Sequence, residues 1–199
     1  MFFSVDCVVV RGDSLTRLVE ERLGLSGPTS VHETRDTSPA RWAGITEGAL
    51  HTRLADVPVL PGVEETTRWC WSNGLVPVIS SLTWSPIGAH LAERFGFHSY
   101  FGQPLDAVRG RFTGTAEGAP VPPSEREFAL RRADELGFTP QECAAVGACR
   151  ADGPLLDSVG LGIAFNARTE TNARTAVPVR GDDLRAVIPS LECLAATRV

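Results

Sequence analysis

The sequence contains no lysine, since all 19 of its basic residues are arginines. This absence excludes every role that needs a lysine amine, such as a Schiff base or an ammonium group that holds a phosphate. A run of basic residues is also absent, and the formal net charge is -5. We therefore expect no nonspecific attraction to nucleic acid or to anionic lipid.

Long hydrophobic runs are absent as well. No segment approaches the ~20 apolar residues that a bilayer crossing needs, so we expect no membrane span. The start lacks a cationic lead and Asp6 interrupts its apolar run, so we expect no signal peptide. The five cysteines are odd in number and widely scattered, which argues against a disulfide framework and favours a cytoplasmic location.

The length of the chain and its pattern of apolar and amphipathic segments are typical of one α/β domain. With 199 residues, 43% of them hydrophobic, the chain is long enough to bury a sizeable core. Four buried strands are predicted from apolar runs at 2–10, 75–80, 143–147 and 161–165. Helices between them are predicted from amphipathic stretches at 15–23, 41–54, 61–71, 86–95 and 124–136. This alternation predicts a mostly parallel sheet with helices on both faces, in a Rossmann-like arrangement.

Short motifs at the expected strand ends carry the candidate chemistry. They are Ser4-Val5-Asp6-Cys7-Val8 with Gly12-Asp13-Ser14 after it, Val78-Ile79-Ser80-Ser81, Phe112-Thr113-Gly114, and Gly147-Ala148-Cys149-Arg150-Ala151-Asp152. Ligands of open α/β sheets bind beyond the carboxyl ends of the strands. We therefore expect the loops after Val5, Ile79 and Val146 to converge on one pocket.

In order and spacing these motifs resemble the haloacid-dehalogenase (HAD) superfamily, in its phosphoserine-phosphatase-like branch. The resemblance covers nearly the whole chain. It implies a HAD-like core at 1–14 and 71–199, with a small helical cap at 15–70 inserted after the first strand. It also implies phosphate-ester hydrolysis, in which a first aspartate attacks phosphorus, a second acts as acid and base, and Mg²⁺ is held by carboxylates and the substrate phosphate.

This chain departs from the family pattern at the positions that carry out the family's reaction. Ser4 stands at the nucleophile's position, and Ser4 and Ala148 occupy the two carboxylate positions of the magnesium site. The lysine that neutralises the phosphoryl oxygens should lie near Glu125 or Arg126. A serine cannot form an aspartyl-phosphate, and Mg²⁺ requires hard oxygen ligands, usually carboxylates. We therefore expect no metal, no cofactor and no useful phosphatase activity.

Asp6 remains as the candidate acid or base, or as a framework residue of its loop. The other residues expected at the pocket are Ser4, Cys7, Ser80, Ser81, Arg126, Cys149, Arg150 and Asp152. Asp152 could pair with Asp6 or hold its own loop, and Ser80 could bind an anion or cap a turn. The two arginines could receive a phosphate or carboxylate, or lie at the surface. Cys7 and Cys149 could form a nucleophile, a metal pair or a redox bridge, or be small buried residues.

Two kinds of function follow from these residues. In the first, the chain is a HAD-fold pseudophosphatase that binds a small molecule or a protein partner without hydrolysing a phosphate ester, with Trp42 on an exposed cap surface as the contact. In the second, it is a repurposed enzyme with Asp6 as acid or base, assisted by Cys7, Cys149 or His51. Residual phosphoserine-phosphatase-like hydrolysis is the least favoured alternative. The identity of the partner and the formation of a homodimer stay open.

Overall fold

The centre of the molecule is a six-stranded parallel sheet in the order β3-β2-β1-β6-β7-β8. The computed structural model describes residues 1–12, 14–25, 38–116, 124–167 and 173–196. The strands of the sheet are β1 (Phe2–Phe3), β2 (Val78–Trp84), β3 (Ser99–Gln103), β6 (Ala144–Gly147), β7 (Leu161–Phe165) and β8 (Val177–Val179). A separate antiparallel pair consists of β4 (Ala107–Val108) and β5 (Arg111–Phe112). The predicted α/β class with a mostly parallel sheet is confirmed.

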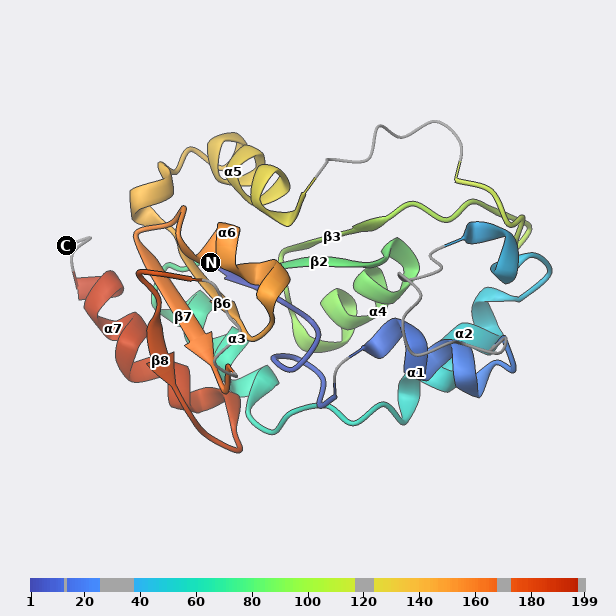
Figure 1. Cartoon of the computed structure of the whole chain (residues 1–199), viewed down its shortest axis with the longest axis horizontal. Coiled ribbons are helices and arrows are strands. Elements are labelled where there is room, and N and C mark those ends of the chain that lie inside the picture. The colour runs from blue at the N-terminus through green and yellow to red at the C-terminus, as the bar shows by residue number, and fades with distance from the viewer. Residues whose placement is uncertain (13, 26–37, 117–123, 168–172, 197–199) are drawn as a thin grey trace.

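Helices cover both faces of this sheet (Figure 1). One face carries α5 (Glu125–Glu135) and α6 (Gly153–Leu156), and the other carries α3 (Val63–Ser72), α4 (Ser85–Phe95) and α7 (Ile188–Ala196). One end of the molecule is formed by α1 (Leu15–Arg22), η1 (Pro39–Trp42), α2 (Glu47–Ala55) and the β4–β5 pair. The remaining short helices are η2 (Pro140–Glu142), η3 (Arg150–Asp152) and η4 (Leu184–Val187).

The core consists of two apolar clusters, one on each face of the sheet. Phe2 and its register partners Val78 and Ala145 belong to the cluster beside α5 and α6. The next residues along the same strands belong to the other cluster, and they are Phe3, Ile79 and Val146. Side chains alternate between the faces of a strand, so the residue after these returns to the α5 face. This alternation decides which side chains at the strand ends face α5.

The predicted first strand, 2–10, is wrong beyond Phe3. The chain turns there, because the N–H groups of residues 8–10 all donate to the carbonyl oxygen of Val5, at 3.0–3.3 Å. Cys7 takes a left-handed conformation with φ 62°, which is uncommon for a residue that is not glycine. The run is apolar because it is a buried turn, and hydrophobicity alone does not distinguish such a turn from a strand.

Four further elements differ from the prediction. The second strand was expected at 75–80, but it begins after Pro77, which has no N–H for the ladder, and continues to Trp84. The edge strands β3 and β8 were not predicted. The predicted helix at 41–54 is divided into η1 and α2 by Gly44, which has φ 84°. The other predicted helices are confirmed.

The boundary of the cap stays a prediction. Within the predicted 15–70, α3 packs against η4 and α4 of the core. The β4–β5 pair lies outside that range, yet Phe112 exchanges backbone hydrogen bonds with Gly44 and Ile45, at 2.9 and 2.8 Å. Asp13 of the first motif and residues 26–37 of the cap lie outside the described residues. None of the helices in the described part of the chain has the length and apolar character that a bilayer crossing requires.

Candidate functional site

The ends of β1 and β6 lie beside the middle of β2 in the sheet. The N–H of Ser4 donates to the carbonyl oxygen of Val146 at 3.0 Å, which extends the pairing of β1 with β6 by one residue. The same register places Ser80 of β2 on one side of Ser4 and Gly147 of β6 on the other. By alternation all three lie on the face of Phe2, which α5 and α6 cover. The loops after β1 and β6 therefore lie side by side as expected, but no loop follows Ile79, because residues 80–84 belong to β2. That these residues line one pocket stays a prediction.

Asp6 ties the loop after β1 to the start of α1. Its Oδ1 accepts a hydrogen bond from the N–H of Leu15, the first residue of that helix, at 2.8 Å. The hydroxyl of Ser14, the N-cap residue, accepts from the N–H of Arg17 at 3.3 Å. Two side chains thus satisfy N–H groups that a helix start leaves without partners. Asp6 has a framework function here, and its acid or base role stays a prediction.

Asp152 shapes the loop after β6 in a similar way. Its Oδ2 accepts from the N–H groups of Ala148 and Cys149, at 2.7 and 2.8 Å, and from the thiol of Cys149 at 3.3 Å. Asp152 is only 2% exposed. Gly147 makes room for it, since a Cβ at Gly147 would lie 2.5 Å from the Cβ of Asp152. The buried carboxylate therefore holds the loop close to the strand end.

Glu125 brings a further carboxylate to this edge. It is the first residue of α5 and is 7% exposed, and its carbonyl oxygen accepts a hydrogen bond from the Ser80 hydroxyl at 3.3 Å. The Ser81 hydroxyl instead accepts from the N–H of Thr83 at 3.4 Å. The sequence prediction named Glu125 only as a position near the missing lysine. Its place directly after the N-cap Ser124 predicts the start of the helix, but this local signal does not show that the Glu125 side chain is buried.

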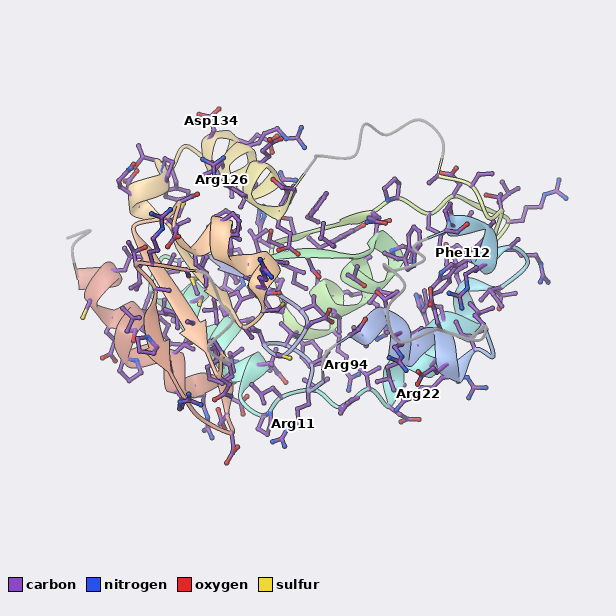
Figure 2. All side chains as sticks on the ribbon, in the orientation of Figure 1. Arg11, Arg22, Arg94, Phe112, Arg126 and Asp134 are labelled. Atoms are coloured by element: carbon purple, nitrogen blue, oxygen red, sulfur yellow. The ribbon has the colours of Figure 1, made fainter. Side chains whose placement is uncertain are left out.

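The two candidate arginines lie at the surface. The Nε of Arg126 donates to the Ser158 hydroxyl at 2.6 Å, and Figure 2 shows Arg126 on α5. Ser158 belongs to the connection between α6 and β7 and not to a strand end. Arg150, the first residue of η3, is exposed. The contact of Arg126 therefore does not deliver a positive charge to Ser4 or Ser80.

The two candidate cysteines are free thiols. Cys7 donates from its Sγ to the carbonyl oxygen of Gly12, at 3.1 Å. Burial raises the pKa of the Cys149 thiol, and the charge and hydrogen bond of Asp152 raise it further. The negative charges of Asp6 and Glu125 act in the same direction on this pKa. Cys149 is therefore protonated at neutral pH, which disfavours it as a nucleophile or as a thiolate ligand.

His51 and Trp42, the cap side chains in the predictions, have partners elsewhere. The His51 ring lies against the ring of His90 on α4, with centroids 5.2 Å apart. Trp42 is fully buried and packs edge-on against Trp84 and Phe112, at centroid distances of 6.1 and 5.9 Å. The expected exposed contact at Trp42 is therefore wrong, because a cluster of aromatic rings encloses it (Figure 2 labels Phe112).

The residues of these loops do not fit the magnesium ion that the family resemblance implies. Ser4 and Ala148 supply no carboxylate at the two expected positions, and Asp152 Oδ2 already accepts three hydrogen bonds. Within the described ranges, no three His, Cys, Asp or Glu side chains are grouped so that they could hold a metal ion. Mg²⁺ favours near-octahedral oxygen ligands with one or two carboxylates. The prediction that the chain uses no cofactor stays a prediction.

Comparison with known sequences shows a distant similarity to phosphoserine phosphatases. No family model matches the chain. A phosphoserine phosphatase from Archaeoglobus fulgidus is 27% identical over 158 residues, which are 79% of this chain and 45% of that protein. The chain spans less than half the length of the curated relatives it matches.

Comparison with solved structures shows the same fold. A phosphoserine phosphatase in its apo form superposes with a TM-score of 0.77 at 19% identity, over 94% of this chain and 96% of that chain. A phospho-aspartyl intermediate analogue of phosphoserine phosphatase superposes with a TM-score of 0.74 at 18% identity, over 95% and 96%. The predicted resemblance to the HAD superfamily and its phosphoserine-phosphatase-like branch is confirmed.

Proposed function

We propose that this chain, which has the fold of the HAD superfamily and resembles its phosphoserine-phosphatase-like branch, is a pseudophosphatase that binds a ligand without hydrolysing a phosphate ester. The observation that carries the proposal is the hydroxyl of Ser4 at the end of β1. One structural relative is a phospho-aspartyl intermediate analogue, so in that protein an aspartate takes the phosphoryl group. The motif resemblance puts Ser4 at the position of that aspartate.

Serine is a poor replacement for this nucleophile. A serine hydroxyl attacks phosphorus only when a neighbouring base removes its proton. Among the described residues no hydrogen bond joins the Ser4 hydroxyl to such a base. His51, the histidine considered for this role, lies against His90 on α4 instead. The residue at the nucleophile's position therefore carries a hydroxyl in place of a carboxylate, and no base bonded to this hydroxyl activates it.

The charges at the site also oppose phosphate chemistry. A transferring phosphoryl group is stabilised by cations aimed at its oxygens, and one such preorganised donor is worth ~100 to 1,000-fold in rate. Here a buried glutamate stands near the expected lysine, and Arg126 contacts Ser158. The same features argue against a repurposed enzyme that uses the protonated Cys149 thiol. A small-molecule or protein partner, with no nucleic acid and no membrane, stays our prediction.

The names of the relatives support a second candidate, a phosphoserine phosphatase. Turnover of phosphoserine and p-nitrophenyl phosphate, with and without Mg²⁺, distinguishes the two. We expect no turnover that depends on Asp6. Any phosphate release by the parent chain should therefore be the same in the Asp6→Asn variant. Asparagine keeps the Oδ1 acceptor for the Leu15 N–H, so this variant removes proton transfer while preserving the loop. Mg²⁺-stimulated turnover that disappears in Asp6→Asn would establish the phosphatase and end the proposal.

A further inference from the structure

The contact between α2 and α4 brings two imidazole rings together. His51 of α2 and His90 of α4 lie with ring centroids 5.2 Å apart and ring planes at 41°. One helical turn further along both helices, Nη1 of Arg94 donates to the carbonyl oxygens of Leu54 and Ala55, at 3.3 and 3.1 Å. The same contact therefore holds two rings that titrate near neutral pH and one permanent positive charge.

The closed contact has no place for a second proton on His90. The Nε2 atom of His90 is buried, and the described residues offer it no hydrogen-bond partner. A protonated imidazole donates from both ring nitrogens, so protonation would leave a buried donor at Nε2 unsatisfied. The packing of His90 against α2 therefore favours its neutral form.

The charges near His90 act mainly in the same direction. Burial lowers the pKa of His90, the positive charges of His51 and Arg94 lower it further, and the negative charge of Glu93 opposes them. Of these groups, His51 comes from α2, whereas Glu93 and Arg94 belong to α4 itself. The two positive neighbours therefore add to the cost of protonating His90 in the closed contact.

The other elements that pack closely against α4 supply little charge. They are β2, β3 and α3. No side chain of β2 is titratable, and β3 has only Tyr100, which lies against α4 at Gly88. The charged residues of α3 are exposed, and two of them, Glu64 and Arg68, pair with each other at 2.6 Å. The charge state of this contact is therefore set by α2 and α4.

Bonds that do not involve α4 hold α2 at both of its ends. The N–H of Glu47 donates to the carbonyl oxygen of Gly110 at 3.0 Å. At the other end, Nη1 of Arg22 on α1 donates to the carbonyl oxygen of Arg53 at 3.1 Å. The contact with α4 can therefore open without unfolding the rest of this end of the molecule.

We infer that the contact between α2 and α4 is a pH-sensitive device, which holds the C-terminal half of α2 against α4 at neutral pH and releases it when His90 takes up a proton. The closed contact lowers the pKa of His90 below its ordinary value of ~6.5, so the open form binds the proton more readily. The closed contact is therefore favoured above about pH 6.5 and becomes less favourable as the pH falls below that value. This inference does not depend on the proposed binding function.

Hydrogen exchange on the unmodified full chain tests the release. Exchange is followed by mass spectrometry at about pH 7.5 and 5.5, and the rates are corrected for the effect of pH on the chemical step. We expect the protection of residues 51–55 to fall severalfold at the lower pH, while residues 63–72 of α3 keep theirs. Unchanged protection of residues 51–55, or an equal loss in both segments, overturns the inference.

Variants assign the release to His90. His90→Gln keeps a polar side chain that does not titrate, so residues 51–55 should be equally protected at the two pH values. His98→Gln removes an exposed histidine outside the contact and should behave as the parent chain does. A loss of protection that persists in His90→Gln, or that disappears in His98→Gln, contradicts the assignment.

The titration of His90 in the parent chain gives a test that needs no variant. The ring protons of the histidines are followed by NMR as the pH is lowered. We expect the His90 ring to titrate below its ordinary range, in the same pH interval in which residues 51–55 lose protection. A His90 ring that titrates at or above its ordinary range, or in an interval separate from the loss of protection, refutes the device.

Discussion

The loops at the carboxyl edge of the sheet and the contact between α2 and α4 hold charges of opposite sign in different ways. At the sheet edge, Asp6 and Asp152 accept hydrogen bonds from backbone N–H groups at 2.7–2.8 Å. Between α2 and α4, His51 and His90 lie ring against ring, and the described residues provide no partner for Nε2 of His90. Negative charge is therefore stabilised where backbone N–H groups donate to the carboxylates, whereas positive charge on His90 is disfavoured, because the described residues offer no acceptor to its Nε2.

One arginine forms hydrogen bonds across the contact between α2 and α4. Nη1 of Arg94, on α4, donates to the carbonyl oxygens of Leu54 and Ala55 at the end of α2, at 3.3 and 3.1 Å (Figure 2 labels Arg94). A cation at a helix C-terminus is favourable, but a protonated imidazole beside it is not. Burial lowers the pKa of His90, and the positive charges of His51 and Arg94 lower it further, against the opposing effect of Glu93.

The largest effect is expected from Asp152→Ala. The change removes a buried carboxylate and leaves the N–H groups of Ala148 and Cys149 without their acceptor. Each buried unsatisfied donor costs ~1–3 kcal/mol, so the free energy of unfolding should fall by about 2–4 kcal/mol. Urea unfolding followed by circular dichroism measures this change.

Asp157→Ala is the matched control for that variant. Asp157 also accepts three hydrogen bonds at one oxygen, from the N–H groups of Arg174 and Thr175 and the hydroxyl of Thr175, but it is exposed. Water can replace its bonds, so its loss should cost clearly less. Equal losses in the two variants would show that burial does not distinguish the sheet-edge carboxylates.

A smaller loss is expected for Asp6→Ala. The variant removes the acceptor for the N–H of Leu15, and side chains that cap helix starts contribute about 1 kcal/mol. Hydrogen exchange at the start of α1 should accelerate, while exchange in β6 stays unchanged. Asp6→Asn keeps an acceptor and should retain most of the stability. A cost for Asp6→Ala as large as that for Asp152→Ala would mean that Asp6 supports more than this helix.

The smallest effect is a pH dependence at the α2–α4 contact. The folded-state pKa of His90 lies below its ordinary value of ~6.5, so the unfolded chain takes up the proton more readily. The free energy of unfolding should therefore be highest above about pH 6.5 and should decrease as the pH falls below that value. Urea midpoints at about pH 7.5 and 5.5 should differ less for His90→Gln than for the parent chain.

His98→Gln serves as the control for this pH series. His98 is exposed and lies 6.1 Å from Trp71, measured between ring centroids, so its removal should leave the acid-dependent loss unchanged. If His90→Gln loses as much stability as the parent between the two pH values, the imidazole pair does not control the contact.

Much of the fold follows from local signals in the sequence. The helix after Ser124 begins where predicted, because the Ser124 hydroxyl accepts from the N–H of Glu127 at 3.2 Å. The helix before Gly96 ends where predicted, because that glycine takes a left-handed conformation with φ 71°. The turn after β1 was not predicted, since its buried valines have the composition of a strand. The edge strands were missed because they are short and partly exposed.

The residues of the candidate site could also be predicted only in part from the sequence. Ser4 after β1 and Ser80 within β2 could be predicted, since each follows an apolar run that belongs to a parallel sheet. The importance of Glu125 could not, because in the sequence it is one of several charges at a helix start. Its burial depends on how α5 lies over the sheet, and no local pattern carries that information.

The sequence by itself determined which chemical groups this protein has. A chain without lysine, with a serine at position 4 and an alanine at position 148, offers no ammonium side chain and no carboxylate at those two positions however it folds. The tertiary structure alone decided which charges meet. Asp6 and Asp152 follow the neighbouring parallel strands β1 and β6, whereas Glu125 reaches this edge because the start of α5 is bonded to Ser80 of β2. Burial and mutual distance set the energy of a charge, and both are properties of the folded chain.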